Sequence, residues 1–284
     1  METNYLQTFV LVAETGSMAE AARRLNLSAT SVAQQLKVLE REFGAALLAR
    51  AGRTVQLTPA GYDVLARARE VLRSMQELRD VARSGAPAQI IRLGSIHTAL
   101  HSIVPGLLMR LVERQPQIQV HIAQDTSTKL YDAVQQGDVD AALCVHPHFT
   151  LPKTIGWRTL RREPLVVLAP ARMAKQDPHE LLRRGPLIRY GRTEWGGQSA
   201  ERYLRSVGIS PSERVELTSL TAIAMMVDRG LGVSLIPDAD PPLPAGLKVA
   251  KIALPQEFES RTLGLLWLRS SAKAGLVKLL LEAL

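Results

Sequence analysis

The spacing of apolar residues changes near residue 88, and this change constrains the fold more than any other feature of the sequence. Helical spacing dominates before it, whereas short apolar runs alternate with helical segments after it. The run Ser84-Gly85-Ala86-Pro87-Ala88 separates the two regions, and Pro87 disfavours helix at the residue before it. We therefore expect about two domains in these 284 residues, with a boundary near residue 88.

The composition is typical of a folded chain with a basic balance. Hydrophobic residues make up 46% and charged residues 22%, which is enough apolar material for packed cores. The net charge of +8 favours polyanionic partners. The first residues lack a signal-peptide pattern, and no apolar run is long enough to span a bilayer. We expect a soluble, cytoplasmic protein with no membrane partner.

Three helices are predicted before residue 44. The first has an apolar face formed by Leu6, Phe9, Val10 and Ala13, and Gly16 ends it. Ser17 and Glu20 predict a capping box for the second, in which the Glu20 carboxylate reaches back to the start of the helix. Ser28 is expected to cap the third helix. The buried stripe of that helix consists of Val32, Leu36, Leu39 and Phe43.

The opposite face of the third helix carries short polar, amide and basic side chains. An amide such as Gln34 can form two hydrogen bonds with adenine in the major groove, and the start of a helix attracts phosphate. This pattern predicts a helix-turn-helix over about Met18 to Lys37 that binds duplex DNA. An ordinary solvated face on a helical hairpin is the alternative.

Two short extended runs follow, 47–50 and 53–57, and they predict a hairpin, or wing. Two arginines at its tip are placed to straddle phosphates, although solvated turn charges are the alternative. The candidate DNA-binding residues of the helix and the wing are Ser28, Thr30, Ser31, Gln34, Gln35, Lys37, Arg50 and Arg53.

A long helix is predicted after Thr58-Pro59, a combination that is typical of a helix start. Apolar residues then alternate by four and three, at Val64, Ala68, Val71, Met75, Leu78 and Ala82. This period indicates a coiled-coil seam through which two copies could dimerise. A packed surface helix is the alternative, since the seam is short.

Several motifs between Ser17 and Gly61 resemble the DNA-binding domain of LysR-type transcriptional regulators. They are Ala21-Ala22-Arg23-Arg24-Leu25, Ser28, Val32, Gln35-Leu36, Leu39-Glu40, Leu47-Leu48-Ala49-Arg50 and Leu57-Thr58-Pro59-Ala60-Gly61. Two positions depart from the family pattern. Leu48 stands where the family usually has Phe, and Ala33 stands where it often has Ser, which removes one hydrogen-bonding group.

Strands and helices alternate after residue 89. Strands are expected at 90–94, 118–122, 141–145, 164–169, 187–190, 215–217 and 262–268, with another that ends at Pro237. Such βαβ units favour a mostly parallel sheet. The region resembles the effector-binding domain of LysR-type regulators, most clearly at Gly230–Pro237 and Gln136–Asp140, and this domain is similar to periplasmic solute-binding proteins.

Two α/β lobes leave a cleft that suits a small ligand. Hydroxyls and free amides at helix starts can bind a carboxylate, so we expect a small organic effector, an anion, although simple helix capping is the alternative. Arg192 and Trp195 would suit an aromatic acid, but a solvated arginine and a packed tryptophan are also consistent with the sequence. The candidate effector-binding residues are Ser95, His97, Thr98, Thr126, Ser127, Thr128, Gly191, Arg192, Thr193 and Trp195.

Metal, redox and catalytic chemistry lack a signature in this sequence. His97 and His101 are four residues apart, but neither cysteines nor a carboxylate cluster accompanies them, so no metal is expected. Cys144 is the single cysteine, which excludes a disulfide within one chain, and it lies in an apolar run. With no catalytic or cofactor motif, we expect neither an enzyme nor a cofactor.

The predicted fold class is α/β overall, with an N-terminal all-α winged helix-turn-helix plus linker helix, then a two-lobe α/β periplasmic-binding-protein-like effector domain. The predicted domains are 1–58 for DNA binding, 59–88 for the linker and dimerisation helix, and 89–284 for effector binding. Within the last, lobe I spans about 89–160 and 263–284, and lobe II about 161–262.

The predicted function is a LysR-type regulator whose binding to double-stranded promoter DNA is modulated by a small-molecule effector. A cytoplasmic solute-binding protein or an enzyme on the same two-lobe fold is the alternative. The resemblance implies a homotetramer, so self-association as a dimer or a dimer of dimers is expected. RNA polymerase is a further candidate partner.

Overall fold

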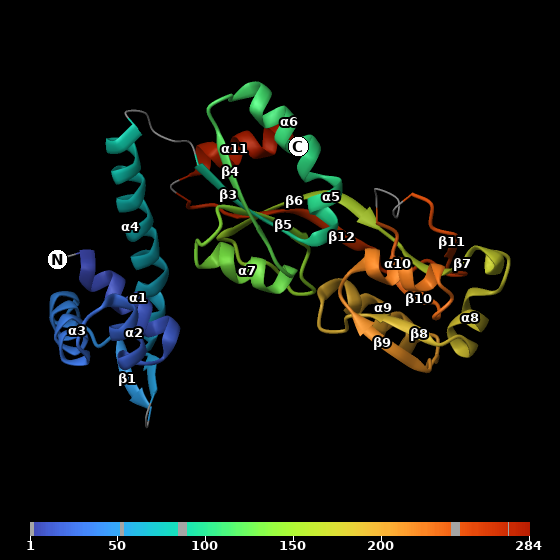
Figure 1. Ribbon diagram of the computed structural model, residues 1–284, viewed down its shortest axis with the longest axis horizontal. Helices are drawn as coiled ribbons and strands as arrows, with labels where there is room; N and C mark the ends of the chain where they lie inside the picture. The colour runs from blue at the N-terminus through green and yellow to red at the C-terminus, as the bar shows by residue number, and fades with distance from the viewer. Residues whose placement is uncertain (1–2, 52–53, 85–89, 240–244, 272) are drawn as a thin grey trace. The chain divides into compact units, whose positions relative to one another are not determined.

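The computed structural model describes residues 3–51, 54–84, 90–239, 245–271 and 273–284 (Figure 1). The chain divides into two compact units. One comprises Met1–Gln89 with Gln135–Asp138, and the other comprises Ile90–Val134 and Val139–Leu284. No helix among the described residues is both long enough and apolar enough to cross a membrane.

The first unit consists of three short helices, a strand pair and one long helix. Its elements are α1 (Thr3–Thr15), α2 (Met18–Leu25), α3 (Ala29–Phe43), β1 (Leu48–Ala51), β2 (Thr54–Leu57) and α4 (Pro59–Ser84). Strands β1 and β2 pair antiparallel, with Leu48 opposite Leu57. Helix α1 packs along one half of α4, and α2 and α3 pack on α1 and on each other (Figure 1).

Local sequence signals fix the ends of the short helices. Ser17 Oγ accepts a hydrogen bond from the Glu20 amide at 3.3 Å, and Asn26 adopts a left-handed conformation with φ of 54° after α2. The predicted capping box is wrong in its second half. The Glu20 carboxylate accepts hydrogen bonds from Arg23 and Arg24 instead, and the bond from Arg23 is the main cause of its lowered pKa.

The core of the first unit differs in detail from the predicted stripes. Val12 is fully buried in α1, whereas Val10 and Ala13 are only half-buried. Phe43, the last residue of α3, is 40% exposed, because the core ends before the helix does. The other three residues of the α3 stripe are buried as predicted, at Val32, Leu36 and Leu39.

The first lobe of the second unit is built on a five-stranded sheet in the order β4-β3-β5-β12-β6. Its strands are β3 (Ile90–Ser95), β4 (Gln119–Gln124), β5 (Ala141–Val145), β6 (Ile155–Glu163) and β12 (Arg261–Leu268). Strand β3 runs parallel to β4 and β5, but β12 is antiparallel to both β5 and β6. The expectation of a mostly parallel sheet is therefore corrected to a mixed sheet, because β12 enters from the second lobe.

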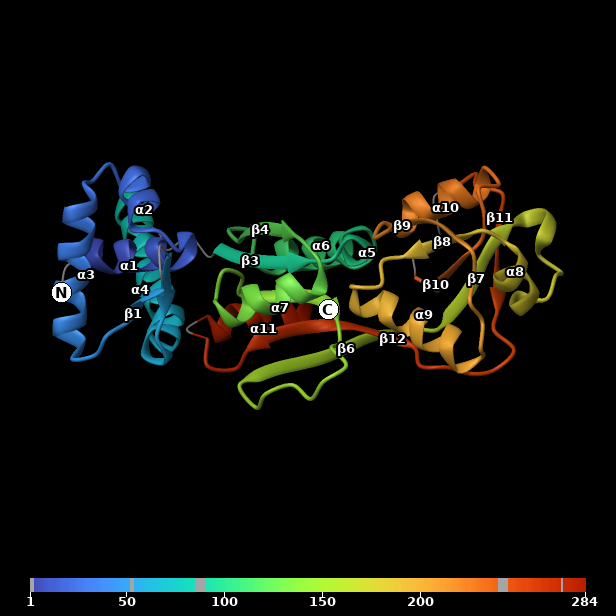
Figure 2. The ribbon, with the colours of Figure 1, turned by 90° about the horizontal axis from the view of Figure 1, so that it is seen from below.

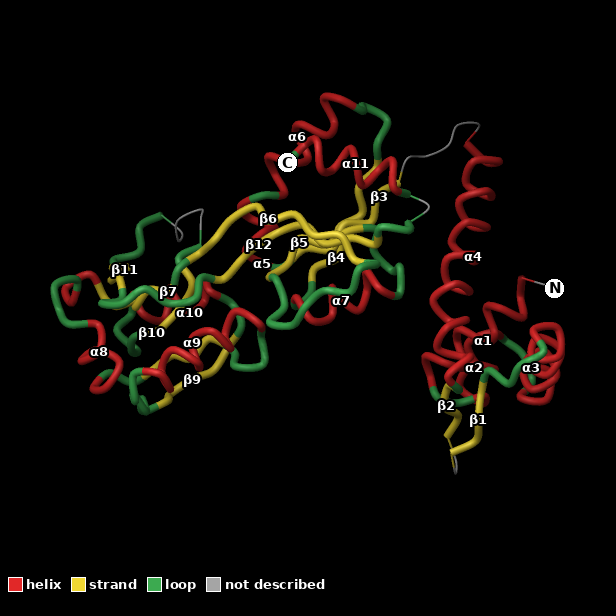
Figure 3. Tube along the Cα trace, turned by 180° about the vertical axis from the view of Figure 1, so that it is seen from behind, coloured by secondary structure: helices red, strands yellow, loops and turns green. Residues whose placement is uncertain are grey.

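Helices cover both faces of this sheet. They are α5 (His97–Ser102), α6 (Val104–Arg114), α7 (Ser127–Gln135) and α11 (Ala274–Ala283). Helices α6 and α11 lie on one face and α7 lies on the other (Figures 1 and 3). The central strand β5, which is buried along its whole length, therefore lies between helical layers, whereas the edge strand β4 is largely exposed.

The second lobe is organised around one buried strand, β7 (Leu165–Pro170), which pairs antiparallel with its neighbours on both sides. Its other elements are α8 (Pro178–Arg184), β8 (Leu187–Tyr190), α9 (Trp195–Ser206), β9 (Glu213–Leu217), α10 (Leu220–Asp228), β10 (Ser234–Pro237) and β11 (Val249–Ala253). Alternate side chains of β7 enter two separate cores. Leu165 and Val167 pack in the core that contains α8 and α9 residues, whereas Val166 and Leu168 pack in the core that contains α10 residues.

Two strands, β6 and β12, connect the lobes and run side by side (Figure 2). Strand β6 was not expected from the sequence, because its arginines obscure the alternation that marks a strand. Arg261, the first residue of β12, lies opposite Glu163, the last residue of β6. Its Nε donates to Glu163 Oε2 at 2.6 Å, and the two residues are 2% and 0% exposed, respectively. A buried ion pair thus lies at the junction of the lobes.

Candidate DNA-binding surface and effector cavity

Polar side chains on successive turns of α3 form one exposed face of the helix. Thr30, Gln34 and Lys37 are all exposed there, beside the equally exposed Ala33. Ser28 caps the helix, since its Oγ accepts from the Ser31 amide at 3.0 Å, and the two serine hydroxyls lie 2.8 Å apart. The face therefore offers an amide, a hydroxyl and an ammonium group near a helix start, a combination suited to base edges and phosphates.

Gln35 differs from its neighbour Gln34. It is half-buried, and its Oε1 accepts a hydrogen bond from Thr8 Oγ1 at 2.6 Å. Thr8 is only 1% exposed on α1. The amide oxygen of Gln35 is thus engaged within the protein, where it holds α3 against α1.

Glu40 connects α3 to the wing. Its Oε1 accepts from the amides of Leu47 and Leu48 at 2.8 and 3.1 Å, at the start of β1. In the wing, Arg50 is exposed and pairs across the hairpin with Val55, while Arg53 lies outside the described residues. Sequence reasoning missed the role of Glu40, although the residue belongs to the Leu39-Glu40 motif.

The start of α4 is fixed against the wing. Thr58 Oγ1 accepts from the Gly61 amide at 3.0 Å and donates to the Ala46 carbonyl at 2.6 Å. A Cβ atom on Gly61 would lie 2.0 Å from the Leu47 carbonyl oxygen, so only glycine fits there. The Thr-Pro-Ala-Gly sequence thus locks the long helix to the DNA-binding core.

A cavity of about 310 Å³ lies in the second unit, between the lobes. First-lobe segments at the ends of β3, β4 and β5 form one side, and second-lobe segments after β8 and β9 form the other. Its lining residues are Ile96, His97, Thr98, Gln124, Asp125, Thr126, Ser127, Val145, Tyr190, Glu194, Gly196, Thr218, Ser219 and Leu220.

Four of the ten predicted effector-binding residues line this cavity: His97, Thr98, Thr126 and Ser127. The others do not line it, and they are Ser95, Thr128, Gly191, Arg192, Thr193 and Trp195. Ser95 is fully buried and donates to the Ile96 carbonyl. Sequence reasoning missed the two acidic residues, Asp125 and Glu194, although each adjoins a predicted residue at the end of a strand.

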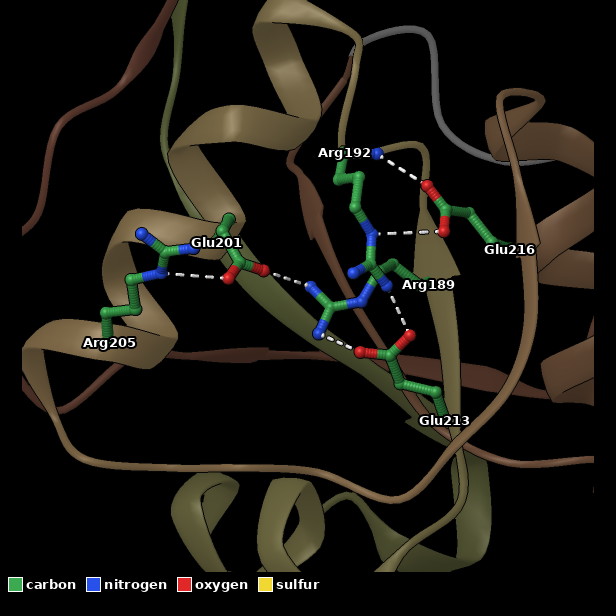
Figure 4. A network of polar contacts seen from close by, with 6 residues as sticks. All are labelled: Arg189, Arg192, Glu201, Arg205, Glu213 and Glu216. Atoms are coloured by element: carbon green, nitrogen blue, oxygen red, sulfur yellow. Dashed lines mark hydrogen bonds and ion pairs between the residues drawn. The ribbon is translucent and has the colours of Figure 1, made fainter.

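Arg192 does not line the cavity, and its side chain belongs to an ion-pair network (Figure 4). Its Nε donates to Glu216 at 3.1 Å, and it also pairs with Glu213. The buried Arg189 joins Glu213 to Glu201 through contacts of 2.6 and 2.7 Å. These bonds, chiefly the one from Arg189, lower the pKa of Glu213. The guanidinium of Arg192 therefore has carboxylate partners within the protein.

Trp195 packs as a core residue. It is 7% exposed, and its ring lies edge-on to Tyr131 and Phe149, with centroid distances of 6.0 and 5.9 Å. The predicted clamp of Arg192 and Trp195 around an aromatic acid is therefore not formed at the cavity wall. Trp195 is instead a packed core tryptophan, which was the alternative interpretation of the sequence.

Two titratable groups of the cavity have shifted pKa values. Burial raises the pKa of Glu194, and nearby Asp125 adds to the effect. Burial lowers the pKa of His97, with a further contribution from His101, which disfavours the charged form of this imidazole. Among the described residues, no group of three His, Cys, Asp or Glu side chains is placed to hold a metal ion.

Cys144 lies in the centre of the first-lobe sheet. It is 0% exposed on β5, and burial raises its pKa to about 12. A thiol with this pKa carries almost no reactive thiolate at neutral pH. The residue therefore acts as a small apolar side chain of the core.

A helix-turn-helix with a wing, joined to a two-lobed domain with a cavity, defines a DNA-binding regulator with a ligand-binding domain. Comparison with known families agrees. Residues 3–62 match the model for the bacterial regulatory helix-turn-helix protein, lysR family, and residues 84–284 match the LysR substrate binding domain.

Individual proteins give the same result over the whole chain. The chain is 29% identical to the HTH-type transcriptional regulator IlvR of Caulobacter vibrioides, over 99% of this chain and 98% of that protein. A full-length OxyR variant from Pseudomonas aeruginosa is 27% identical with a TM-score of 0.66, over 100% of this chain and 94% of that one. CbnR in complex with its target DNA shares the fold, with 20% identity, a TM-score of 0.61 and full coverage of both chains.

The chain belongs to the LysR family of transcriptional regulators. It is a DNA-binding regulator with an effector-binding domain and not an enzyme. The family, fold class and general function predicted from the sequence are confirmed.

Proposed function

We propose that α3 contacts promoter DNA in the major groove, with Thr30 and Gln34 at base edges and Lys37 at a phosphate. Arg50 and Arg53 of the wing contact phosphates on either side. The exposed polar face of α3, at the second helix of a helix-turn-helix, is the observation that carries this proposal. Gln35 positions α3 through Thr8, and Ser28 and Ser31 support the helix start that faces the DNA. Since promoter DNA is its target, we place the protein in the cytoplasm.

The exposed apolar residues support self-association. Val71 and Leu78 of the predicted seam on α4 are 43% and 63% exposed, whereas Ala68 is buried in the core of its own unit. In the second unit, Met109 and Val112 on α6 are 67% and 48% exposed. The exposed apolar residues of α4 suit an interface that forms a dimer. Those of α6 suit a second interface, through which two dimers would form a homotetramer.

The proposed domain assignment follows the same division of roles. Residues 1–58 bind DNA, 59–88 link and dimerise, and 89–284 bind the effector between lobes I and II at the boundaries predicted above. An effector that binds one arrangement of the lobes more tightly shifts the population toward it, and the DNA-binding domains follow. RNA polymerase remains a candidate partner at the promoter.

Two adjacent glutamines give a matched test of the DNA-contact proposal. Gln34→Ala should relax the preference at one base pair per half-site by about 1–3 kcal/mol, while affinity for random duplex is retained. Gln35→Ala should instead destabilise the first unit, because it leaves the buried Thr8 hydroxyl without its acceptor. Binding to a panel of single-base operator variants measures the first effect, and urea unfolding followed by circular dichroism measures the second.

The comparison of the two variants decides the assignment. Equal loss by Gln34→Ala on operator and random DNA would refute base contact by this residue. A change of base preference in Gln35→Ala, without loss of stability, would transfer that role to Gln35.

A further inference from the structure

The cavity between the lobes has an excess of negative charge. Asp125 and Glu194 line it, whereas its described lining includes neither lysine nor arginine. His97 also lines the cavity, and its lowered pKa disfavours the positively charged form. An effector with negative charge alone would approach two carboxylates without a basic side chain to receive it.

The two carboxylates differ in their partners. Asp125 accepts from the Thr126 amide at 2.8 Å, and Lys129 Nζ lies 3.2 Å from it. No described residue donates a hydrogen bond to the half-buried Glu194 carboxylate or forms an ion pair with it. Glu194 therefore faces the cavity as a carboxylate that lacks a directly bonded counter-ion.

A buried cation, Arg261, lies behind the cavity wall. Arg261 Nη2 lies 3.4 Å from Thr98 Oγ1 at the cavity wall. Arg261 Nε donates to Glu163, and this carboxylate also pairs with Arg161 at 2.7 Å, so the three side chains together keep one positive charge. None of the three lines the cavity, and among the described lining residues the carboxylate without a bonded partner is that of Glu194.

Helices α5, α7, α9 and α10 all begin at the cavity wall, and of these α7 belongs to the first lobe and α10 to the second. Ser127 is the first residue of α7, and Leu220 is the first residue of α10. The first N–H groups of a helix have no acceptor within it and carry partial positive charge. No described residue accepts from the backbone N–H of either residue. The cavity thus offers donors for a carboxylate in addition to the acceptor Glu194.

We propose that the effector is a small zwitterion with an ammonium group and a carboxylate, as in an amino acid. The ammonium group pairs with Glu194, and the carboxylate accepts from the helix starts of α7 and α10. The volume of about 310 Å³ suits a small molecule. This inference rests on the proposed function, because it takes the cavity as the effector site. It replaces the expectation of a simple anion.

Thermal unfolding of the full-length protein with the proteinogenic L-amino acids, at millimolar concentration, tests the proposal. A ligand that binds only the native state raises the Tm. We expect one amino acid or a few related ones to do so. The carboxylic acid that lacks the amino group and the amine that lacks the carboxylate should each bind at least about tenfold more weakly.

Glu194→Gln keeps the size of the side chain and removes its charge. It should weaken binding of the amino acid by about tenfold or more, without weakening binding of the deaminated acid. Glu257→Gln is the matched control, since Glu257 is exposed and does not line the cavity. This control should bind the amino acid as the unaltered protein does.

Three results would overturn the proposal that the effector is a zwitterion. They are tighter binding of the deaminated acid, unchanged amino-acid binding in Glu194→Gln, and no response to any amino acid. Duplex binding by the same preparation separates these results from failure of the proposed function. A chain that binds a specific duplex but no amino acid refutes the ligand class alone, whereas a chain that binds no duplex refutes the proposed function.

Discussion

The DNA-contacting surface and the effector cavity are encoded in different ways. Successive turns of one helix, α3, carry the proposed base and phosphate contacts, so residue spacing alone places Thr30, Gln34 and Lys37 on one face. The cavity is assembled from segments that lie far apart in the chain, from Ile96 to Leu220. A helix face can be recognised locally, whereas a cavity depends on how strands cross between lobes.

The largest expected effect is a loss of stability in the second unit alone. Glu163→Gln leaves the buried Arg261 without its charge partner, which should destabilise the second unit by about 3–5 kcal/mol. All three tryptophans, Trp157, Trp195 and Trp267, lie in this unit, so urea unfolding followed by tryptophan fluorescence measures it selectively.

Glu282→Gln provides the control for that variant. Glu282 forms exposed ion pairs with Arg114 and Lys278, which should contribute less than about 1 kcal/mol. Similar losses in both variants would show that burial of the Glu163–Arg261 pair has no special role.

A second variant should destabilise the first unit and leave the second unit unchanged. Gly61→Ala places a Cβ atom 2.0 Å from the Leu47 carbonyl oxygen, and relieving this overlap should destabilise the first unit by about 1–3 kcal/mol. DNA affinity should fall, while the tryptophan transition of the second unit stays unchanged. Gly275→Ala, where a Cβ meets nothing within 4 Å, should leave both properties intact. Unchanged DNA affinity in Gly61→Ala would contradict the account of the Thr58–Gly61 motif.

The contrast between the units also explains what the sequence could and could not predict. The cap at Ser28 and three of the four residues of the α3 stripe depend on neighbours within one or two helical turns, and they were predicted correctly. The carboxylate of Glu20 was misplaced, because two nearby arginines compete for it. Such competition depends on side-chain geometry that residue spacing does not specify.

The cavity was predicted less completely for a related reason. Strand–helix junctions located His97 and Thr126, which line the cavity. Arg192 follows a strand in the same way, yet Glu213 and Glu216 from a neighbouring segment hold its side chain elsewhere. The sequence identifies where a strand ends but not which partners capture the side chains there.

A smaller effect distinguishes phosphate contact from base contact on α3. Lys37→Ala should weaken binding to operator and random duplex alike, and it should reduce the dependence of log K on log salt by about 1. Lys175→Ala changes an equally exposed lysine in the second unit and serves as the control. A loss confined to the operator would assign Lys37 to base recognition.

The smallest effect is expected at Cys144. With a pKa of about 12 and no exposed surface, this thiol should not react with a thiol reagent at pH 8 until urea unfolds the protein. Hydrogen peroxide should leave DNA binding unchanged. Rapid modification of the native protein would contradict a purely structural role for the residue.

Selection of binding sites from a random duplex pool by the intact protein tests most directly whether two paired copies present α3 to DNA. We predict enrichment of an inverted repeat whose half-sites are separated by one helical turn, about 10–10.5 base pairs, or a multiple of it. Gln34→Ala should relax one position in each half-site symmetrically. Enrichment of an asymmetric single site, or of no site, would contradict the account.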